Sequence, residues 1–126
     1  MRIEHIALWV KDPEKMKEFY CNYFLAVPSE KYYNAQKKFS SYFLSFKNGA
    51  RIEIMHKPGL NSATHLESYG WAHLAISAGS RESVDKLTDR LRDDGYTVTS
   101  NPRTTGDGYY ESTVLDPEGN QIEITE

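Results

Sequence analysis

The chain has 126 residues, of which 39% are hydrophobic and 26% charged, and its formal net charge is −3. This composition is typical of a folded globular domain and differs from that of disordered chains. Lys and Arg are scattered among Asp and Glu, so the sequence does not predict a nucleic-acid partner. No apolar run approaches the roughly 20 residues of a membrane-spanning helix. We therefore expect one soluble domain, residues 1–126, that does not enter a membrane.

The only cysteine and the N-terminus both bear on location. Cys21 cannot form an intramolecular disulfide, and Met-Arg-Ile-Glu-His at the N-terminus begins a strand-like alternation rather than a signal sequence. These features predict a cytoplasmic protein.

The first module, residues 1–56, reads as βαβββ. Residues 2–10 alternate as in a strand. Asp12 can cap a helix that has Pro13 in its first turn and ends near Phe24. Strand-like stretches follow around residues 32–33, 41–46 and 50–55, and Asn48-Gly49 is typical of a hairpin turn.

The second module, residues 71–126, shows the same order after a linker at 57–70 that is rich in turn-forming residues. A strand over 71–78 precedes a helix that Ser80 can cap and that ends near Gly95. Strand-like stretches cover residues 96–99, 109–115 and 121–125, with a turn at 116–119.

The two modules repeat residues as well as elements. His5-Ile-Ala-Leu reappears as His73-Leu-Ala-Ile, and Arg-Ile-Glu53-Ile reappears as Gln-Ile-Glu123-Ile. The histidines are 68 positions apart (73 − 5) and the glutamates 70 (123 − 53). We expect an α+β fold in which two βαβββ modules form a curved mixed sheet, with helices on the outer face and a metal cleft on the inner face.

The repeated polar residues are candidate metal ligands. Strand alternation places His5, Glu53, His73 and Glu123 on the faces opposite their aliphatic neighbours. Two imidazoles and two carboxylates suit one divalent ion: Zn or Ni first, with Co, Mn or Fe as alternatives. The matching repeat positions carry this prediction, because a single strand His or Glu is usually an ordinary polar side chain.

Other polar and aromatic residues do not recur at matching positions of the two modules. His56 has the opposite parity to Glu53 and His65 lies in the linker, so both are expected to be surface residues. Trp9 shares the face of His5 and could line a pocket. The Gly-rich segment 104–109 fits no phosphate-binding fingerprint and is expected to form a mobile loop.

These motifs resemble the glyoxalase I, bleomycin-resistance and extradiol-dioxygenase superfamily, the vicinal oxygen chelate proteins, over essentially the whole chain. The most specific pieces are the two His-containing strands, Ile-Glu53-Ile, and Leu-Asp-Pro-Glu-Gly-Asn-Gln-Ile-Glu123-Ile. In glyoxalase I these four His and Glu positions hold the metal. The superfamily's dioxygenases and fosfomycin thiol transferases generally lack the second position, so Glu53 favours small bacterial glyoxalase I-like proteins.

The resemblance implies a lyase or isomerase that acts on a small vicinal-oxygen substrate through an enediolate. Glu123 is the first choice for the base and Glu53 for a ligand or partner, with the roles exchangeable. Bacterial glyoxalase I enzymes have an Arg for glutathione where this chain has Trp9. Lactoylglutathione lyase is one activity that fits, whereas an aromatic wall suits a phenolic, quinone-like or apolar substrate. Trp9, Arg51 and Tyr109 are the candidate substrate-pocket residues.

The sequence is also compatible with two other functions. A non-haem Fe(II) dioxygenase also needs two His and a carboxylate. A non-catalytic protein that sequesters an aromatic compound or an antibiotic could use Trp9 and the tyrosines. The resemblance also implies a homodimer, with the active cleft completed across the interface.

Overall fold

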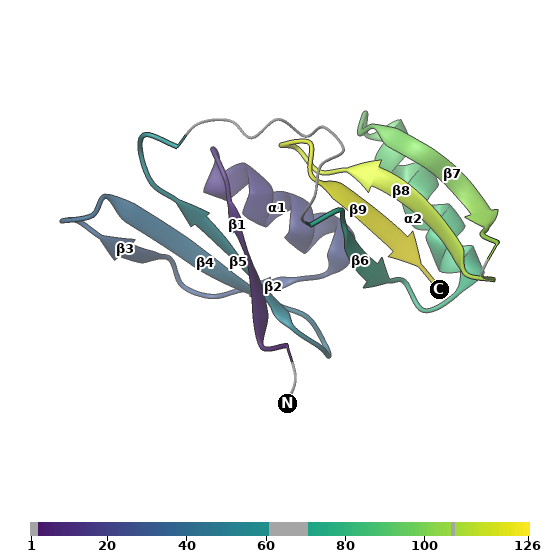
Figure 1. Ribbon diagram of the computed structural model, residues 1–126, viewed down its shortest axis with the longest axis horizontal. Coiled ribbons are helices and arrows are strands. Elements are labelled where there is room, and N and C mark those ends of the chain that lie inside the picture. Colours follow the sequence, from purple (N-terminus) through teal and green to yellow (C-terminus); the bar gives the residue numbers. More distant parts are fainter. Residues whose placement is uncertain (1–2, 61–70, 107) are drawn as a thin grey trace. The chain divides into compact units, whose positions relative to one another are not determined.

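A computed structural model describes residues 3–60, 71–106 and 108–126. These residues form two helices and nine strands in two mixed sheets, which confirms the predicted α+β class (Figure 1). The chain divides into two compact units, Met1–Ala63 and Thr64–Glu126. The predicted module boundaries lie close to this division, and a single domain stays a prediction. No helix in the described ranges is long and apolar enough to cross a membrane.

The first unit is a five-stranded sheet with one helix. Its strands follow the order β1-β5-β4-β2, and β3 also pairs with β4. The β1–β5 pair is parallel and the other pairs are antiparallel. The elements are β1 (His5–Trp9), α1 (Pro13–Phe24), β2 (Val27–Pro28), β3 (Tyr32–Asn34), β4 (Phe39–Ser45) and β5 (Arg51–His56).

Helix α1 begins and ends as the sequence predicts. The Asp12 side chain accepts a hydrogen bond from the Lys15 amide, and Pro13 occupies the first turn. Helix α1 packs on β4 and β5 (Figure 1). Its apolar stripe is buried. The core of this unit contains Met16, Phe19, Tyr20, Leu44, Ile52 and Ile54.

The second unit is a four-stranded sheet with one helix. The strand order is β6-β9-β8-β7, with β6 and β9 parallel and the other pairs antiparallel. Helix α2 packs on β7, β8 and β9 (Figure 1). The elements are β6 (Leu74–Ser77), α2 (Arg81–Asp93), β7 (Val98–Thr104), β8 (Tyr110–Leu115) and β9 (Gln121–Thr125).

Strand β7 is longer than the predicted stretch at 96–99 and begins two residues later. Its sequence is polar and contains Pro102, and its pairing with β8 shifts register between Val98 and Ser100 and again before Arg103. An edge strand tolerates a proline and irregular pairing, because one of its sides has no strand to pair with. This is why the apolar pattern failed to mark its full length.

The strand registers determine which residues share a face. In the first unit Glu53 pairs with Ala7 of β1 and Phe43 of β4. In the second unit Glu123 pairs with Ala75 and Thr113. Paired residues project to the same side of a sheet, and the buried isoleucines beside each glutamate project to the helix. Each glutamate therefore lies on the face of its sheet that the helix leaves uncovered. We call this face the open face.

Candidate metal centre

The first unit brings His5 and Glu53 together on its open face. His5 begins β1 and Glu53 lies in the middle of the adjacent parallel strand β5. The His5 Nε2 atom is 4.0 Å from Glu53 Oε2, and only 16% of the Glu53 side chain is exposed. The ring of Phe43 meets the imidazole edge-on at a centroid distance of 5.4 Å. This arrangement leaves Nε2 facing the carboxylate.

The other ring nitrogen of His5 is held by Glu4, a residue that the sequence did not single out. His5 Nδ1 lies 2.5 Å from Glu4 Oε2, and Glu4 also pairs with the Arg51 guanidinium. The hydrogen bond with His5, helped by Arg51, lowers the pKa of Glu4 below its ordinary value. A carboxylate on one imidazole nitrogen fixes the ring and makes the opposite nitrogen a better metal ligand. The pattern that could have indicated this role is the Glu-His dipeptide directly before an alternating strand.

The second unit brings His73 and Glu123 together in the same way. His73 directly precedes β6 and Glu123 lies in the middle of the adjacent parallel strand β9. The His73 Nε2 atom is 3.4 Å from Glu123 Oε2, and 19% of the Glu123 side chain is exposed. The predicted repeat therefore places one imidazole next to one carboxylate in each unit.

Both pairs have spacings that suit ligands of a single ion. Imidazole nitrogen and carboxylate oxygen bind Zn²⁺ at about 2.0–2.2 Å, so two such ligands of one ion lie at most about 4.3 Å apart, and near 3.4 Å at tetrahedral angles. The His73–Glu123 separation matches the tetrahedral value, and the His5–Glu53 separation is within the upper limit. Among residues 3–60, 71–106 and 108–126, no group of three or more His, Cys, Asp or Glu is arranged to hold a metal. Each described pair is thus half of the predicted ligand set.

The three candidate substrate residues occupy different surroundings. Trp9 is 47% exposed and lies on the open face of the first sheet, opposite Met55. Arg51 lies on that face too, but its guanidinium pairs with Glu4 and stacks 4.1 Å from the Phe43 ring. Its charge is therefore paired with a carboxylate, and its place in a substrate pocket stays a prediction.

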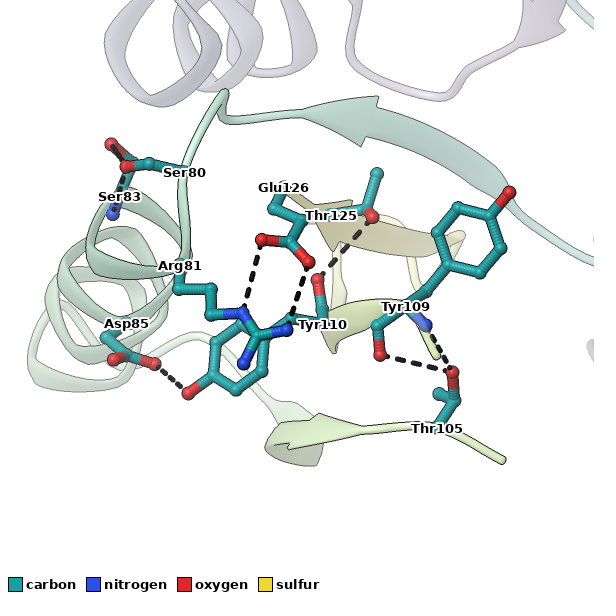
Figure 2. A network of polar contacts seen from close by, with 9 residues as sticks. All are labelled: Ser80, Arg81, Ser83, Asp85, Thr105, Tyr109, Tyr110, Thr125 and Glu126. Carbon is teal, nitrogen blue, oxygen red and sulfur yellow. Dashed lines mark hydrogen bonds and ion pairs between the residues drawn. The ribbon is translucent and has the colours of Figure 1, made fainter. Parts of the chain in front are cut away.

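Tyr109 belongs to the second unit and is held by its backbone (Figure 2). Its amide donates to Thr105 Oγ1 and its carbonyl accepts from the Thr105 amide, which closes a turn before β8. Its ring is 59% exposed, whereas the neighbouring Tyr110 hydroxyl donates to Asp85 of α2 at 2.7 Å. A role for Tyr109 in substrate binding stays a prediction.

The remaining histidines do not join the two pairs. His56 lies on the helix-covered face, as its parity predicts, but it is half-buried rather than a free surface residue. Its Nδ1 lies 2.9 Å from the Val10 carbonyl oxygen, which ties the end of β5 to the chain after β1. His65 and most of the predicted linker lie outside the described residues.

Sequence comparison identifies the family. Residues 2–124 match the model of the glyoxalase/bleomycin resistance protein/dioxygenase superfamily. The chain belongs to this superfamily. A relative, the uncharacterized protein YqjT of Bacillus subtilis, is 32% identical over 127 residues, which cover 97% of this chain and 96% of YqjT.

Solved structures of superfamily members share the fold. Glyoxalase I of Zea mays has a TM-score of 0.81 with 22% identity over 98% of this chain, which spans only 44% of the maize chain. The trypanothione-dependent glyoxalase I of Leishmania major has a TM-score of 0.79 with 20% identity, covering all of this chain and 86% of its own. A possible glyoxalase from Bacillus cereus has a TM-score of 0.73 with 25% identity over 100% and 99% of the two chains.

Proposed function

We propose that the chain is a metal-dependent lyase or isomerase of the glyoxalase I type. His5, Glu53, His73 and Glu123 are assigned as ligands of one divalent ion, Zn²⁺ or Ni²⁺ first and Co²⁺, Mn²⁺ or Fe²⁺ as alternatives. The observation that carries the proposal is the duplication of one His–Glu pair on the open face of each unit, at 4.0 and 3.4 Å. Either pair alone would be unremarkable.

The chemistry of the donor set fits this assignment. The set consists of two neutral imidazole nitrogens and two anionic carboxylates. Divalent ions of this kind bind such a mixture of ligands well. Glu4 on the far nitrogen of His5 is the kind of outer partner that metal-bound imidazoles commonly have. When bound, the ion would polarise two neighbouring oxygens of a substrate and make the adjacent C–H more acidic.

The carboxylates supply the proton-transfer step. Glu123 is assigned as the base that removes a proton from one carbon and returns it to the next, and Glu53 as its symmetry-related partner. Both side chains are largely shielded from solvent, with 19% and 16% exposed. Shielding from water limits proton exchange with solvent during such a transfer. No redox cofactor is needed for a transfer of this kind.

The proposal also covers the protein's location, oligomeric state and partners. We assign the protein to the cytoplasm as a homodimer that acts on a small molecule, with neither nucleic acid nor membrane as a partner. Lactoylglutathione lyase is the first activity to assay, because glyoxalase I enzymes are among the solved relatives.

The experiment combines metal content with turnover. Protein purified without added metal is analysed for elements, then assayed for thioester formation from the glutathione–methylglyoxal adduct with each candidate ion. We expect one ion per chain, and in Glu123→Gln a loss of activity of about 10²–10⁴-fold. Glu82→Gln, which changes an exposed carboxylate of α2, is the matched control. Unchanged metal content and turnover in Glu123→Gln would refute the proposal, as would oxygen uptake with an Fe²⁺-loaded protein on catechols.

A further inference from the structure

Three aromatic side chains cluster at one end of the open face of the first sheet. Trp9 of β1, Phe39 of β4 and Tyr32 of β3 are called the aromatic patch. The centroids of Trp9 and Phe39 are 6.1 Å apart with nearly perpendicular rings, and those of Tyr32 and Phe39 are 6.0 Å apart. Trp9 is 47% and Tyr32 55% exposed. The rings thus contact one another while keeping much of their surface accessible within the described unit.

The second unit forms the same sheet core without most of these aromatic residues. Where Trp9 pairs with Met55 in the first unit, Ser77 pairs with Thr125 in the second. Where Phe43 pairs with Glu53, Thr113 pairs with Glu123. Folding of a βαβββ module therefore does not require large aromatic side chains on its open face. Their presence in the first unit needs another reason, and ligand binding is one.

A cation lies beside the aromatic patch. The Lys57 ammonium is 4.9 Å from the centroid of the Trp9 ring, directly after β5. It has no carboxylate partner among the residues that the structure describes, whereas the other open-face cation, Arg51, is paired with Glu4. A lysine in this position attracts a negatively charged group toward the exposed rings.

We propose that the aromatic patch and Lys57 bind a single-ring aromatic acid, with its ring on Trp9 and Phe39 and an anionic oxygen group at the ammonium. Met55 follows Glu53 by two residues on β5 and pairs with Trp9. Two residues span about 6.6 Å of strand, which is comparable to the length of a substituted benzene ring. The inference rests on the proposed function for its last step: the bound acid is the substrate, whose neighbouring oxygens reach the His5–Glu53 pair.

The binding test uses metal-free protein and three matched probes. Phenylacetate carries the ring and the charge, cyclohexylacetate only the charge, and phenylacetamide only the ring. The chain has two tryptophans, and Trp71 is 92% exposed, so Trp71→Phe leaves Trp9 as the only indole. We expect phenylacetate to change the Trp9 fluorescence and to bind about two- to tenfold more tightly than either of the other probes.

Variants then assign the two parts of the site. By calorimetry, Trp9→Leu should weaken phenylacetate binding about tenfold, and Lys57→Met, which keeps the apolar stem, about fivefold. Lys57→Met should leave phenylacetamide binding unchanged. Lys86→Met of α2 is the control lysine, paired with Glu82 and outside the patch. Equal binding of cyclohexylacetate and phenylacetate, or wild-type affinity in Trp9→Leu, would overturn the inference.

The same protein separates this inference from the proposed function. Glu123→Gln should keep phenylacetate binding in the metal-free state while losing metal and turnover. Ring binding without metal uptake would refute the proposed function and the last step of the inference, but not the binding site itself. Metal-dependent turnover without ring binding would refute the inference only. If the patch is instead covered by a second copy of the chain, Trp9→Leu will shift the protein from dimer to monomer without changing the affinity for phenylacetate.

Discussion

His5 and Glu4 are neighbours in the chain, yet the Nδ1 atom of His5 lies 2.5 Å from the Glu4 carboxylate. Adjacent residues of a regular strand project to opposite faces, so this contact requires that the strand begin at His5 rather than before it. The Arg51 guanidinium holds the same carboxylate from β5, and the Arg51 amide donates to the Glu4 carbonyl. Glu4, itself held by Arg51, therefore fixes the orientation of the His5 imidazole at the start of β1.

Changing Glu4 should weaken metal binding without removing a ligand. In Glu4→Gln the amide can still accept a hydrogen bond from His5, but it lacks the charge that orients and polarises the ring. We expect the affinity for Zn²⁺ to fall about tenfold or more, which is typical of such outer partners. Competition with a chromogenic chelator measures this. Glu82→Gln is the control for loss of an acidic residue, and equal affinities in all three proteins would contradict the outer-partner role.

The sequence predicted which face of its sheet each of the four His and Glu side chains occupies, because strand parity is a local property. His5, Glu53, His73 and Glu123 each alternate with aliphatic residues that the helices bury, so the face of each side chain followed from the period of two. The assignment of α1 and α2 was secure for a similar reason, because Asp12 and Ser80 are capping residues directly before amphipathic segments.

The parts that escaped prediction depend on contacts between distant segments. Lys57 was placed in a linker, and nothing local indicates that its ammonium lies over Trp9. The sequence did not indicate that Arg51 pairs with Glu4, because the two residues are 47 positions apart. Strand β7 was underestimated because edge strands do not need the apolar alternation by which strands are recognised. Such features depend on contacts between segments that are distant in the sequence. These contacts leave no periodic pattern in a single sequence.

A buried carboxylate controls the turn that leads into β9. Asp116 is 4% exposed, and its Oδ1 accepts hydrogen bonds from the amides of Glu118 and Asn120 while Oδ2 accepts one from the Asn120 side chain. Gly119 in this turn has a φ of 84°, in the left-handed region that favours glycine. The turn joins β8 to β9, in whose register Thr113 pairs with Glu123.

Removing that carboxylate should destabilise the protein and loosen the second His–Glu pair. Asp116→Ala leaves the part-buried amides of Glu118 and Asn120 without their acceptor, so we expect a loss of about 2 kcal/mol in the free energy of unfolding. Asp116→Asn keeps one acceptor oxygen and should lose about 1 kcal/mol. Urea denaturation measures both, and a fall in metal affinity that follows the same order would link the turn to Glu123. Wild-type stability in Asp116→Ala would contradict this account.

Two buried hydroxyls join α2 to β8. Thr88 Oγ1 donates to the Val84 carbonyl and lies 2.6 Å from Ser112 Oγ, and both side chains are fully buried. Thr88→Val leaves the Ser112 hydroxyl without its partner and should cost about 2 kcal/mol, whereas Thr88→Ser keeps the hydroxyl and should cost about 1 kcal/mol. In the double variant Thr88→Val/Ser112→Ala both polar groups are gone. We expect the double variant to lose about 1 kcal/mol less unfolding free energy than the sum of the losses in Thr88→Val and Ser112→Ala. Strict additivity in thermal or chemical denaturation would show that the hydroxyls do not interact.

Glu14 gives the first unit an acid-sensitive contact between α1 and β4. Its carboxylate receives hydrogen bonds from Lys17 at 2.5 Å, Tyr42 at 2.7 Å and Lys31 at 2.9 Å. These bonds, that of Lys17 first, lower the pKa of Glu14 from 4.5 to about 2. Because the folded-state pKa lies below the unfolded one, the stabilisation is complete above about pH 4.5 and disappears as the pH falls toward 2.

Glu14→Gln should therefore be less stable than the parent at neutral pH and equally stable near pH 2. Nearly half of the Glu14 side chain is exposed, and exposed ion pairs are screened by water and salt, so we expect a difference of only about 1 kcal/mol at pH 7. The measurement is the free energy of unfolding of both proteins between pH 2 and 7. Glu82→Gln, which removes an exposed carboxylate paired with Lys86 alone, should differ from the parent by no more than about 0.5 kcal/mol. A Glu14→Gln deficit that stays constant down to pH 2 would show that the side chain stabilises the fold through packing rather than through its charge.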